Sequence, residues 1–183
     1  MDILAHIRLL AHYNQWMNDK VYEAAGKLDA AALEADRGAF FGSVLGTLNH
    51  IMVGDTIWLK RLGTHPADHR SLDVVRRAER PSSLDQILYR DLALLLLQRK
   101  ALDATIIAWT GELTEPDLDH ALEYHNMKGV PQRKRFGSLV LNLFNHQTHH
   151  RGQATTLLAQ ASLDVGVTDL LALIPDEQTP RSA

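Results

Sequence analysis

Apolar residues recur every three or four positions in several long stretches of this 183-residue chain. An α-helix turns by about 100° per residue, so this spacing gives each stretch one face that can be buried against a neighbour. Long amphipathic stretches of this kind restrict the chain to folds in which helices pack side by side. The first stretch shows the pattern clearly, with one polar member: Ile3, Ile7, Leu10, Asn14, Met17 and Val21.

Signals for helix starts and ends divide the chain into four long predicted helices. The first covers residues 3–26 and ends at Gly26, and the second covers 43–62, with Ser43 as its N-cap and Gly63 just beyond. The third is predicted to start at Ser83, because Ser83-Leu84-Asp85-Gln86 fits a capping box, and to run to about Trp109. The fourth covers residues 137–161.

The connections between these helices differ in length and character. Residues 64–82 are polar, contain Pro66 and Pro81, and read as a long connection. Residues 124–130 resemble a hairpin or long loop with Gly129 at its turn, and residues 168–174 are expected to form a short C-terminal helix before Pro175. We therefore expect an all-α fold, a four-helix bundle in a single domain over residues 1–175. A small insertion precedes the last long helix, and residues 176–183 form a frayed tail.

Composition excludes several classes of protein. The formal net charge is −3, and the short cluster Arg133-Lys134-Arg135 does not make a nucleic-acid surface. The longest apolar run, residues 92–97, is too short to span a membrane, and the N-terminus lacks the pattern of a signal peptide, so a cytoplasmic location is expected. The chain has no cysteine, so any metal site must use nitrogen and oxygen ligands.

Histidine is the unusual residue, with ten copies, three of them between positions 146 and 150. His146 and His150 are four residues apart and therefore share one helix face, which suits binding of one metal ion by both rings. They continue an apolar line through Leu139, Leu143, Ala154 and Leu157, whereas His149 falls on a polar line with Asn142, Asn145, Gly152 and Thr156. The alternative is a pair of core histidines that hydrogen-bond to neighbouring helices.

A third metal ligand would have to come from another helix. His50 is the best candidate, although its helix is apolar nearly all round and its direction stays ambiguous. Asp55 points about 140° away from His50 and is expected at the mouth of the pocket. Gln147 stands where the zinc-protease motif has glutamate, and paired Glu-x-x-His motifs are absent, so neither a zinc protease nor a ferritin-type two-metal site is expected.

The strings Leu48-Asn49-His50, Asn145-His146 and His149-His150-Arg151-Gly152-Gln153, with the opening string at residues 13–18, resemble the DinB-like (damage-inducible B) family. The resemblance covers residues 1–175. It implies an antiparallel four-helix bundle with one long crossover connection, commonly a homodimer. It also implies one divalent metal ion held by His50, His146 and His150, with zinc or nickel favoured over iron or manganese. Relatives of this kind include S-transferases and isomerases that use low-molecular-weight thiols.

Together these points lead us to expect a metal-dependent transferase or hydrolase that acts on a small molecule. Three neutral imidazoles leave the ion its full double positive charge and at least one open coordination position for water or substrate. Because the chain has no cysteine, any thiol would come from a cosubstrate. No catalytic residue can be assigned, and Asp55 and His149 are the candidates for a general base. Asn14, Asn49 and Asn145 are candidates to hydrogen-bond the ligands. The alternative is a non-catalytic, stress-related protein in which the metal serves binding or stability.

Overall fold

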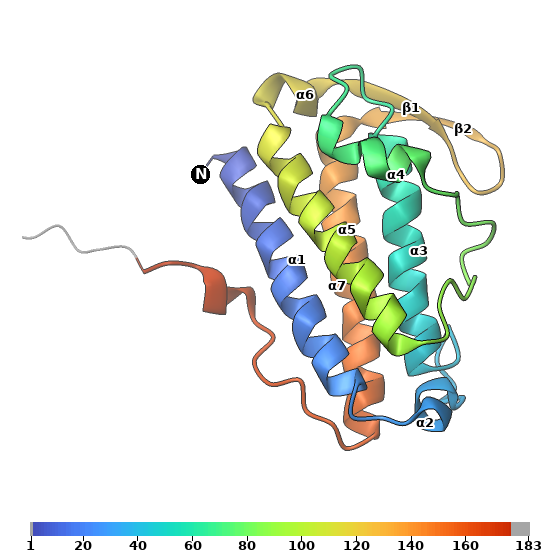
Figure 1. The fold of residues 1–183 in the computed structure, drawn as a ribbon. Helices are drawn as coiled ribbons and strands as arrows, with labels where there is room; N and C mark the ends of the chain where they lie inside the picture. The colour runs from blue at the N-terminus through green and yellow to red at the C-terminus, as the bar shows by residue number, and fades with distance from the viewer. Residues whose placement is uncertain (1, 177–183) are drawn as a thin grey trace, which may run out of the picture.

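The computed structural model describes residues 2–176. Four long helices lie along one another, and short helices and a hairpin close the two ends (Figure 1). The long helices are α1 (Ile3–Ala25), α3 (Val44–Leu62), α5 (Leu92–Glu112) and α7 (Phe136–Gln160). The shorter elements are α2 (Ala30–Glu34), η1 (Arg70–Leu72), α4 (Asp73–Arg77), α6 (Glu115–Asp119), β1 (Ala121–His125), β2 (Pro131–Arg135) and η2 (Leu170–Leu173).

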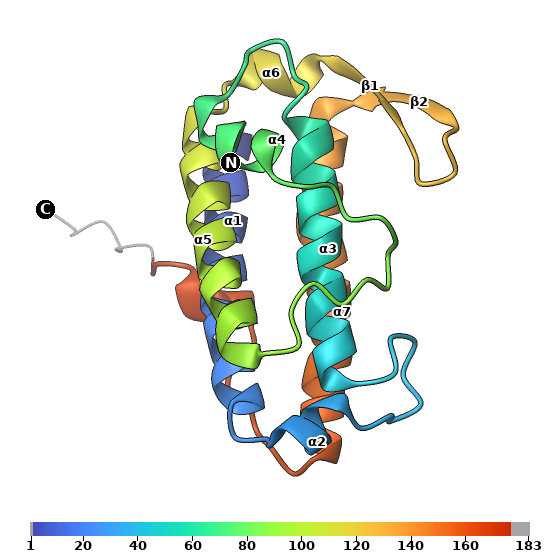
Figure 2. The same cartoon turned by 45° about the vertical axis from the view of Figure 1, so that its right-hand side comes forward.

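Helix α1 packs against both α5 and α7, and α3 packs against α7 (Figure 2). In Figure 1, α1 and α7 run downward while α3 and α5 run upward. Residues 63–91 therefore carry the chain back along the molecule, from the end of α3 to the start of α5. The buried apolar side chains of the four long helices meet between them, among them Ile7, Leu48, Ile106 and Leu143. This arrangement brings the middle of α3 next to the middle of α7.

Three of the four long helices begin and end close to their predicted positions. The Asp2 carboxylate accepts a hydrogen bond from the Leu4 N–H at the start of α1, and the Ser43 hydroxyl accepts one from the Gly46 N–H at the start of α3. Gly26 and Gly63 follow the ends of these two helices, as predicted. Local capping chemistry is thus sufficient to place these ends.

The predicted start of the third helix at Ser83 is wrong, because α5 begins at Leu92 with the Asp91 carboxylate as its cap. Residues 84–90 are held in an irregular conformation by Asn49 of α3. Its Oδ1 accepts hydrogen bonds from the N–H groups of Leu88 (2.8 Å) and Tyr89 (3.0 Å), and its Nδ2 donates to the Tyr89 carbonyl (2.9 Å). Asn49, which belongs to another helix, thus binds backbone N–H and C=O groups that would otherwise form the hydrogen bonds of a helix in this segment. The other end of α5 passes the predicted stop and includes Gly111.

The insertion before α7 is a β-hairpin. Strands β1 and β2 pair antiparallel, with Ala121 opposite Arg135 and His125 opposite Pro131, and Gly129 adopts a φ of +75° in the turn. The Asn126 Oδ1 accepts hydrogen bonds from the N–H groups of Lys128 and Val130, which stabilises the turn. The fold is therefore mostly helical with a two-stranded sheet, and the all-α prediction is corrected at this hairpin.

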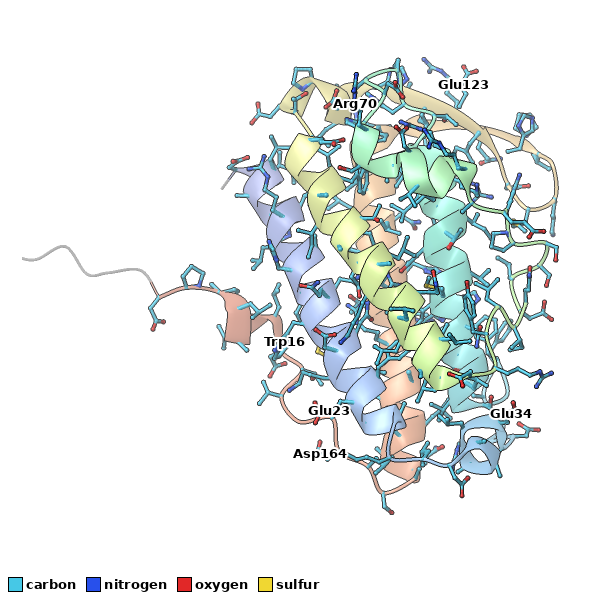
Figure 3. The ribbon with its side chains drawn as sticks, viewed as in Figure 1. Trp16, Glu23, Glu34, Arg70, Glu123 and Asp164 are labelled. Atoms are coloured by element: carbon cyan, nitrogen blue, oxygen red, sulfur yellow. The ribbon has the colours of Figure 1, made fainter. Side chains whose placement is uncertain are left out.

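Several charged side chains lie on the outside of the molecule. Figure 3 shows Glu23, Glu34 and Asp164 near the end that carries α2, and Arg70 and Glu123 near the opposite end. No helix within residues 2–176 combines the length and the apolar character that crossing a membrane requires. The predicted frayed tail lies outside the described residues, apart from Asp176.

Candidate metal centre

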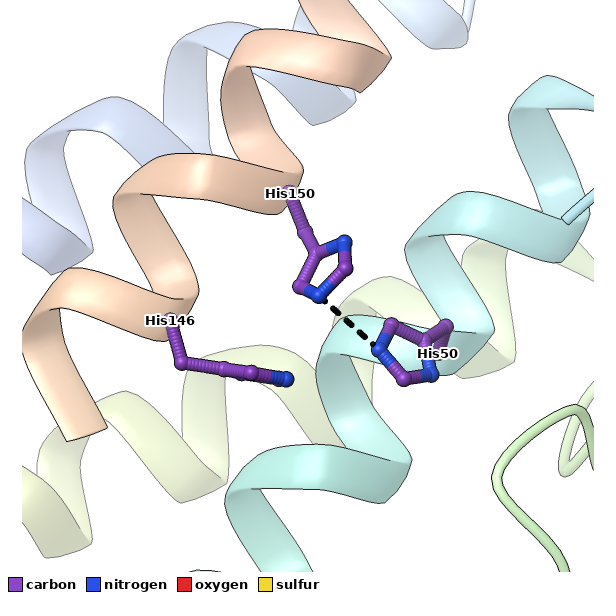
Figure 4. A group of neighbouring side chains, drawn as sticks. All are labelled: His50, His146 and His150. Carbon is purple, nitrogen blue, oxygen red and sulfur yellow. Dashed lines mark hydrogen bonds between the residues drawn. The ribbon is translucent and has the colours of Figure 1, made fainter. Parts of the chain in front are cut away.

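Three histidines meet between α3 and α7. His50 comes from α3, and His146 and His150 come from α7, one helical turn apart (Figure 4). Their rings point toward one another, and one nitrogen from each lies within 4.8 Å of the others. The structure thus brings together the three residues that the sequence singled out as possible ligands. His50 is buried, whereas His146 and His150 are half-buried.

Hydrogen bonds fix where the protons of two of these rings sit. The Nδ1–H of His50 donates to the Leu84 carbonyl at 2.7 Å, and the Nδ1–H of His150 donates to Oε1 of Gln153 at 2.8 Å. Each neutral ring therefore carries a lone pair on Nε2. The two Nε2 atoms face each other at 3.1 Å, close to the roughly 3.3 Å that separates two nitrogens bound to one tetrahedral zinc ion. Two lone pairs at this distance repel unless a cation lies between them, so the arrangement fits a metal ion.

The protein environment favours neutral rings at this centre. Burial lowers the pKa of His146 to about 3, and the nearby rings of His150 and His50 act in the same direction. Burial also lowers the pKa of His50 and of His150. Since a histidine must be unprotonated to bind a metal ion, all three rings are ready to bind near neutral pH. Nδ1 of His146 is buried without a hydrogen-bond partner among residues 2–176.

Two further residues shape the centre sterically. A Cβ atom at Gly54 would lie 2.4 Å from Cε1 of His146, so glycine is needed there for the ring to fit against α3. The ring of Phe41, in the loop before α3, stacks on His50 with the ring centroids 3.7 Å apart and the planes tilted by 16°. Phe41 therefore covers one side of the histidine cluster.

Three polar residues that were predicted near the ligands take different roles. Asn49 orders the segment that presents the Leu84 carbonyl, so it acts on His50 only through that segment. Asn145 lies on the exposed face of α7 and makes no side-chain hydrogen bond within the described part of the chain. His149 is exposed, as expected from its place on the polar face of the predicted helix. Its ring centroid lies 4.8 Å from that of His150.

Asp55 and Asn14 belong to a buried polar network in the core. Oδ2 of Asp55 accepts hydrogen bonds from Arg99 at 2.5 Å and from Gln147 at 2.8 Å, and the residue is fully buried, so the predicted position at the pocket mouth is wrong. Burial raises the pKa of the Asp55 carboxyl, and the Arg99 guanidinium opposes that shift. Asn14 donates to Asp103 and accepts from Arg151. The network ties α1, α3, α5 and α7 together.

A second cluster could in principle hold a metal ion, since His65, His69 and Asp117 also bring ligand atoms within 4.8 Å of one another. Its hydrogen bonds fit a metal less well. Nδ1 of His65 accepts from the Ala67 N–H at 3.1 Å, which places the proton on Nε2 and leaves neither nitrogen with a free lone pair. Oδ2 of Asp117 already accepts from the N–H and the hydroxyl of Thr114, both at 2.8 Å. We therefore take the His50 cluster as the candidate centre.

The sequence did not reveal four contributors to this centre: the Leu84 carbonyl, Gln153, Gly54 and Phe41. Gln153 lies three residues after His150, on the same helix face, so its position as hydrogen-bond acceptor could have been found from spacing. The other three contacts join residues from separate elements or involve a backbone carbonyl, for which sequence periodicity holds no signal.

Comparison with known proteins identifies the family of this chain. The sequence profile described as the DinB family matches residues 3–180, nearly the whole chain. The chain belongs to the DinB family. This result confirms the resemblance noted from the histidine strings.

Individual relatives show how far the likeness extends. The DinB-family chain is 23% identical to Protein DinB of Bacillus subtilis (strain 168) over 167 residues, which cover 87% of this chain and 88% of that protein. A 47-residue stretch is 45% identical to the uncharacterized protein YrdA of the same organism, covering 26% and 28% of the two chains. The crystal structure of a DinB-like protein from Bacillus cereus ATCC 10987 matches with a TM-score of 0.57 and 21% identity, covering 82% of this chain and 89% of that one. This last match shows that the two proteins share a fold.

Proposed function

We propose that His50, His146 and His150 bind one divalent metal ion, and that the protein uses it as a transferase or hydrolase of small molecules. The observation that carries this proposal is the pair of Nε2 atoms 3.1 Å apart, each with its lone pair directed inward by a hydrogen bond on the opposite side of the ring. A pair of neutral core histidines without a metal would instead place a proton between the two nitrogens and lose one of the outer hydrogen bonds. Keeping both outer bonds would require one ring to be protonated, which the burial of His50 and His150 disfavours.

The donor set bears on which metal is bound. Three imidazole nitrogens and no thiolate suit zinc or nickel, with iron and manganese as less favoured ions. Three protein ligands, where four would close a tetrahedral site, leave a position for water or substrate. When bound, such an ion supplies a positive charge that activates a water molecule or a thiol cosubstrate as nucleophile near neutral pH.

Residues around the centre would support this chemistry by holding the ligands. The Leu84 carbonyl and Gln153 keep the Nδ1 protons of His50 and His150 in place, which fixes the tautomer and orients each ring. Phe41 shields the His50 ring from water on one side. His149 is exposed beside His150, and we propose it as the group that exchanges protons with solvent. Asp55 is too deeply buried and too fully engaged with Arg99 and Gln147 for that role.

We also propose the assembly that the family resemblance implies. In this view α1, α3, α5 and α7 form an antiparallel four-helix bundle with residues 63–91 as its crossover, in one domain over residues 1–175. Leu94 and Leu97 on the outer face of α5 are 52% and 60% exposed, and a second copy of the chain would cover them in a homodimer. The cytoplasmic location stays a prediction.

The proposed activity is tested by loading metal-free protein with zinc or nickel and measuring the bound metal. The loaded protein is then screened with low-molecular-weight thiols plus electrophilic acceptors, and with ester and amide substrates. We expect one ion per chain and turnover that disappears in a His150→Ala variant. A His125→Ala variant, changed on the exposed hairpin, is the matched control and should behave like the unaltered protein. Bound metal without turnover across the screen would favour the non-catalytic alternative, and no bound metal would refute the site.

A further inference from the structure

A hollow of about 400 Å³ lies beside the histidine centre, between the loop before α3 and the exposed face of α7. The loop contributes Arg37 and Phe40, and α7 contributes His149, Gly152 and Gln153. The three histidines do not account for this hollow. The residues that line it therefore need a separate explanation.

Gln153 joins the hollow to the centre. Its Oε1 accepts the hydrogen bond from Nδ1 of His150, and its Nε2 lies 3.5 Å from Nε2 of His149. The wall of the hollow is therefore a direct neighbour of a proposed metal ligand. A molecule in the hollow would lie next to the centre.

The α7 side of the hollow is mostly polar, with Leu157 as its one apolar side chain. His149, Gln153, Thr156 and Gln160 step by four, three and four residues, which places them on one side of the helix. Gly152 lies among them, and a Cβ atom there would meet no other atom within 4 Å. Glycine inside a helix is unfavourable relative to alanine, and no close packing among the described residues explains it here. Its bare backbone leaves room for a bound molecule.

The opposite wall carries a positive charge without a counter-ion. Arg37 is part-buried and forms no ion pair with any carboxylate among residues 2–176. Its Nη2 makes one long hydrogen bond to the Ala32 carbonyl (3.3 Å), and its buried Nε has no partner. The loop that carries it is ordered by a hydrogen bond from the Arg37 N–H to the Gly42 carbonyl at 2.8 Å. The guanidinium has no counter-ion, its Nε is buried, and the hydrogens that Nη1 and Nη2 leave free are suited to bind a carboxylate.

Phe40 adds an apolar surface next to this charge. Phe40 is 87% exposed, whereas the ring of the neighbouring Phe41 stacks on His50. A ligand of the hollow would thus have a carboxylate for Arg37 and an apolar part that covers Phe40.

We propose that this hollow binds the carboxylate-bearing part of a small substrate whose reacting group reaches the metal ion. The proposal rests on the proposed function, since it needs the ion at the histidine centre. It narrows the substrate class to small monocarboxylates or larger anions with a free carboxylate and an apolar spacer. Arg37 is then the residue that determines this specificity.

Hydroxamates of two kinds test the proposal, because a hydroxamate binds divalent metal ions by itself. One series carries a terminal carboxylate on a spacer of two to five methylene groups, and the matched series carries a terminal amide. With zinc-loaded protein we expect at least one carboxylate compound to bind about tenfold more tightly than its amide partner, the scale of a hydrogen bond to a charged group. In an Arg37→Gln variant that advantage should disappear while the amide compounds bind as before.

Two variants keep the test interpretable. Arg133→Gln removes an exposed arginine on the hairpin and should leave the carboxylate advantage intact. Gly152→Leu fills the hollow and should weaken the long compounds of both series without changing the metal content. If metal is bound and no spacer length gives the carboxylate an advantage, the proposal is overturned. If the protein binds no metal, neither series binds, and metal analysis then identifies the failure as that of the proposed function, which also removes the substrate role of the hollow.

Discussion

Gly54 of α3 and His146 of α7 are packed so closely that a methyl group on Gly54 would lie 2.4 Å from Cε1 of the imidazole. The close contact between Gly54 and His146 therefore limits how near α3 and α7 can come to each other at the candidate metal centre. His146 occupies the space that any other residue at position 54 would fill, so the position of the ring depends on a residue that carries no functional group.

The substitution Gly54→Ala should weaken zinc binding by tenfold or more, since the His146 ring must move away from the position in which it meets His50 and His150. Zinc affinity is measured by competition with a chromophoric chelator. Gly152→Ala is the matched control, because it places the same methyl group on α7 where no atom lies within 4 Å, and its zinc affinity should be unchanged. Equal affinity in both variants would mean that Gly54 does not position the ligand.

Gln153→Leu should lower zinc affinity by about 10- to 100-fold, because His150 loses the acceptor that holds its Nδ1 proton. Gln153→Glu keeps an oxygen acceptor at the same place and should retain most of the affinity. Gln160→Leu changes the same face of α7 further along, away from the histidines, and serves as the control. A Leu variant that binds zinc like the original protein would show that the hydrogen bond to His150 is dispensable.

Asn49→Ala should release the segment at residues 84–90, since three of the hydrogen bonds made by Asn49 hold its backbone. We expect a loss of roughly 2–4 kcal/mol in the free energy of unfolding, from buried groups left without partners. Zinc affinity should fall as well, because His50 depends on the Leu84 carbonyl. Hydrogen exchange at the Leu88 and Tyr89 amides measures the release directly. Unchanged protection at these two amides would contradict the role given to Asn49.

The sequence predicted features that depend on local spacing. The bounds of α1, α3 and α7 follow from caps and apolar periodicity, and the hairpin follows from its turn residues. The separation of His146 and His150 from His149 follows from the same periodicity. The start of α5 could not be predicted, because Asn49, on a distant helix, binds the backbone that the capping-box pattern had assigned to a helix.

The residues around the proposed ligands show the same limit of prediction from local spacing. The sequence suggests Asn14, Asp55 and Asn145 as polar neighbours of the ligands, yet two of them lie in a core network and the third is exposed. Their roles depend on which helix faces them, and periodicity gives only the direction of a side chain on its own helix. His50 is the best candidate for the third ligand from its place in a largely apolar helix, but its direction cannot be read there, and only the family resemblance implies that it binds the metal.

The metal-free protein should become less stable as the pH falls below about 6.5. Burial lowers the pKa of His146 to about 3 and lowers the pKa of His50, His65 and His150 as well. In the unfolded chain these rings titrate near 6.5, so between that pH and about 3 the unfolded state binds protons that the folded state does not. Urea unfolding in the presence of a chelator should give a lower midpoint at pH 5.5 than at pH 7.5. A midpoint that stays level or rises toward pH 5.5 would contradict the lowered pKa values.

The most direct test is an anomalous difference map from crystals of the zinc-loaded protein, recorded on both sides of the zinc absorption edge. We expect one strong peak per chain, within bonding distance, about 2.0–2.1 Å, of nitrogens from His50, His146 and His150. We expect no comparable peak at His65, His69 and Asp117. No peak between the three histidines, or a peak at the second cluster alone, would contradict the assignment of the metal centre.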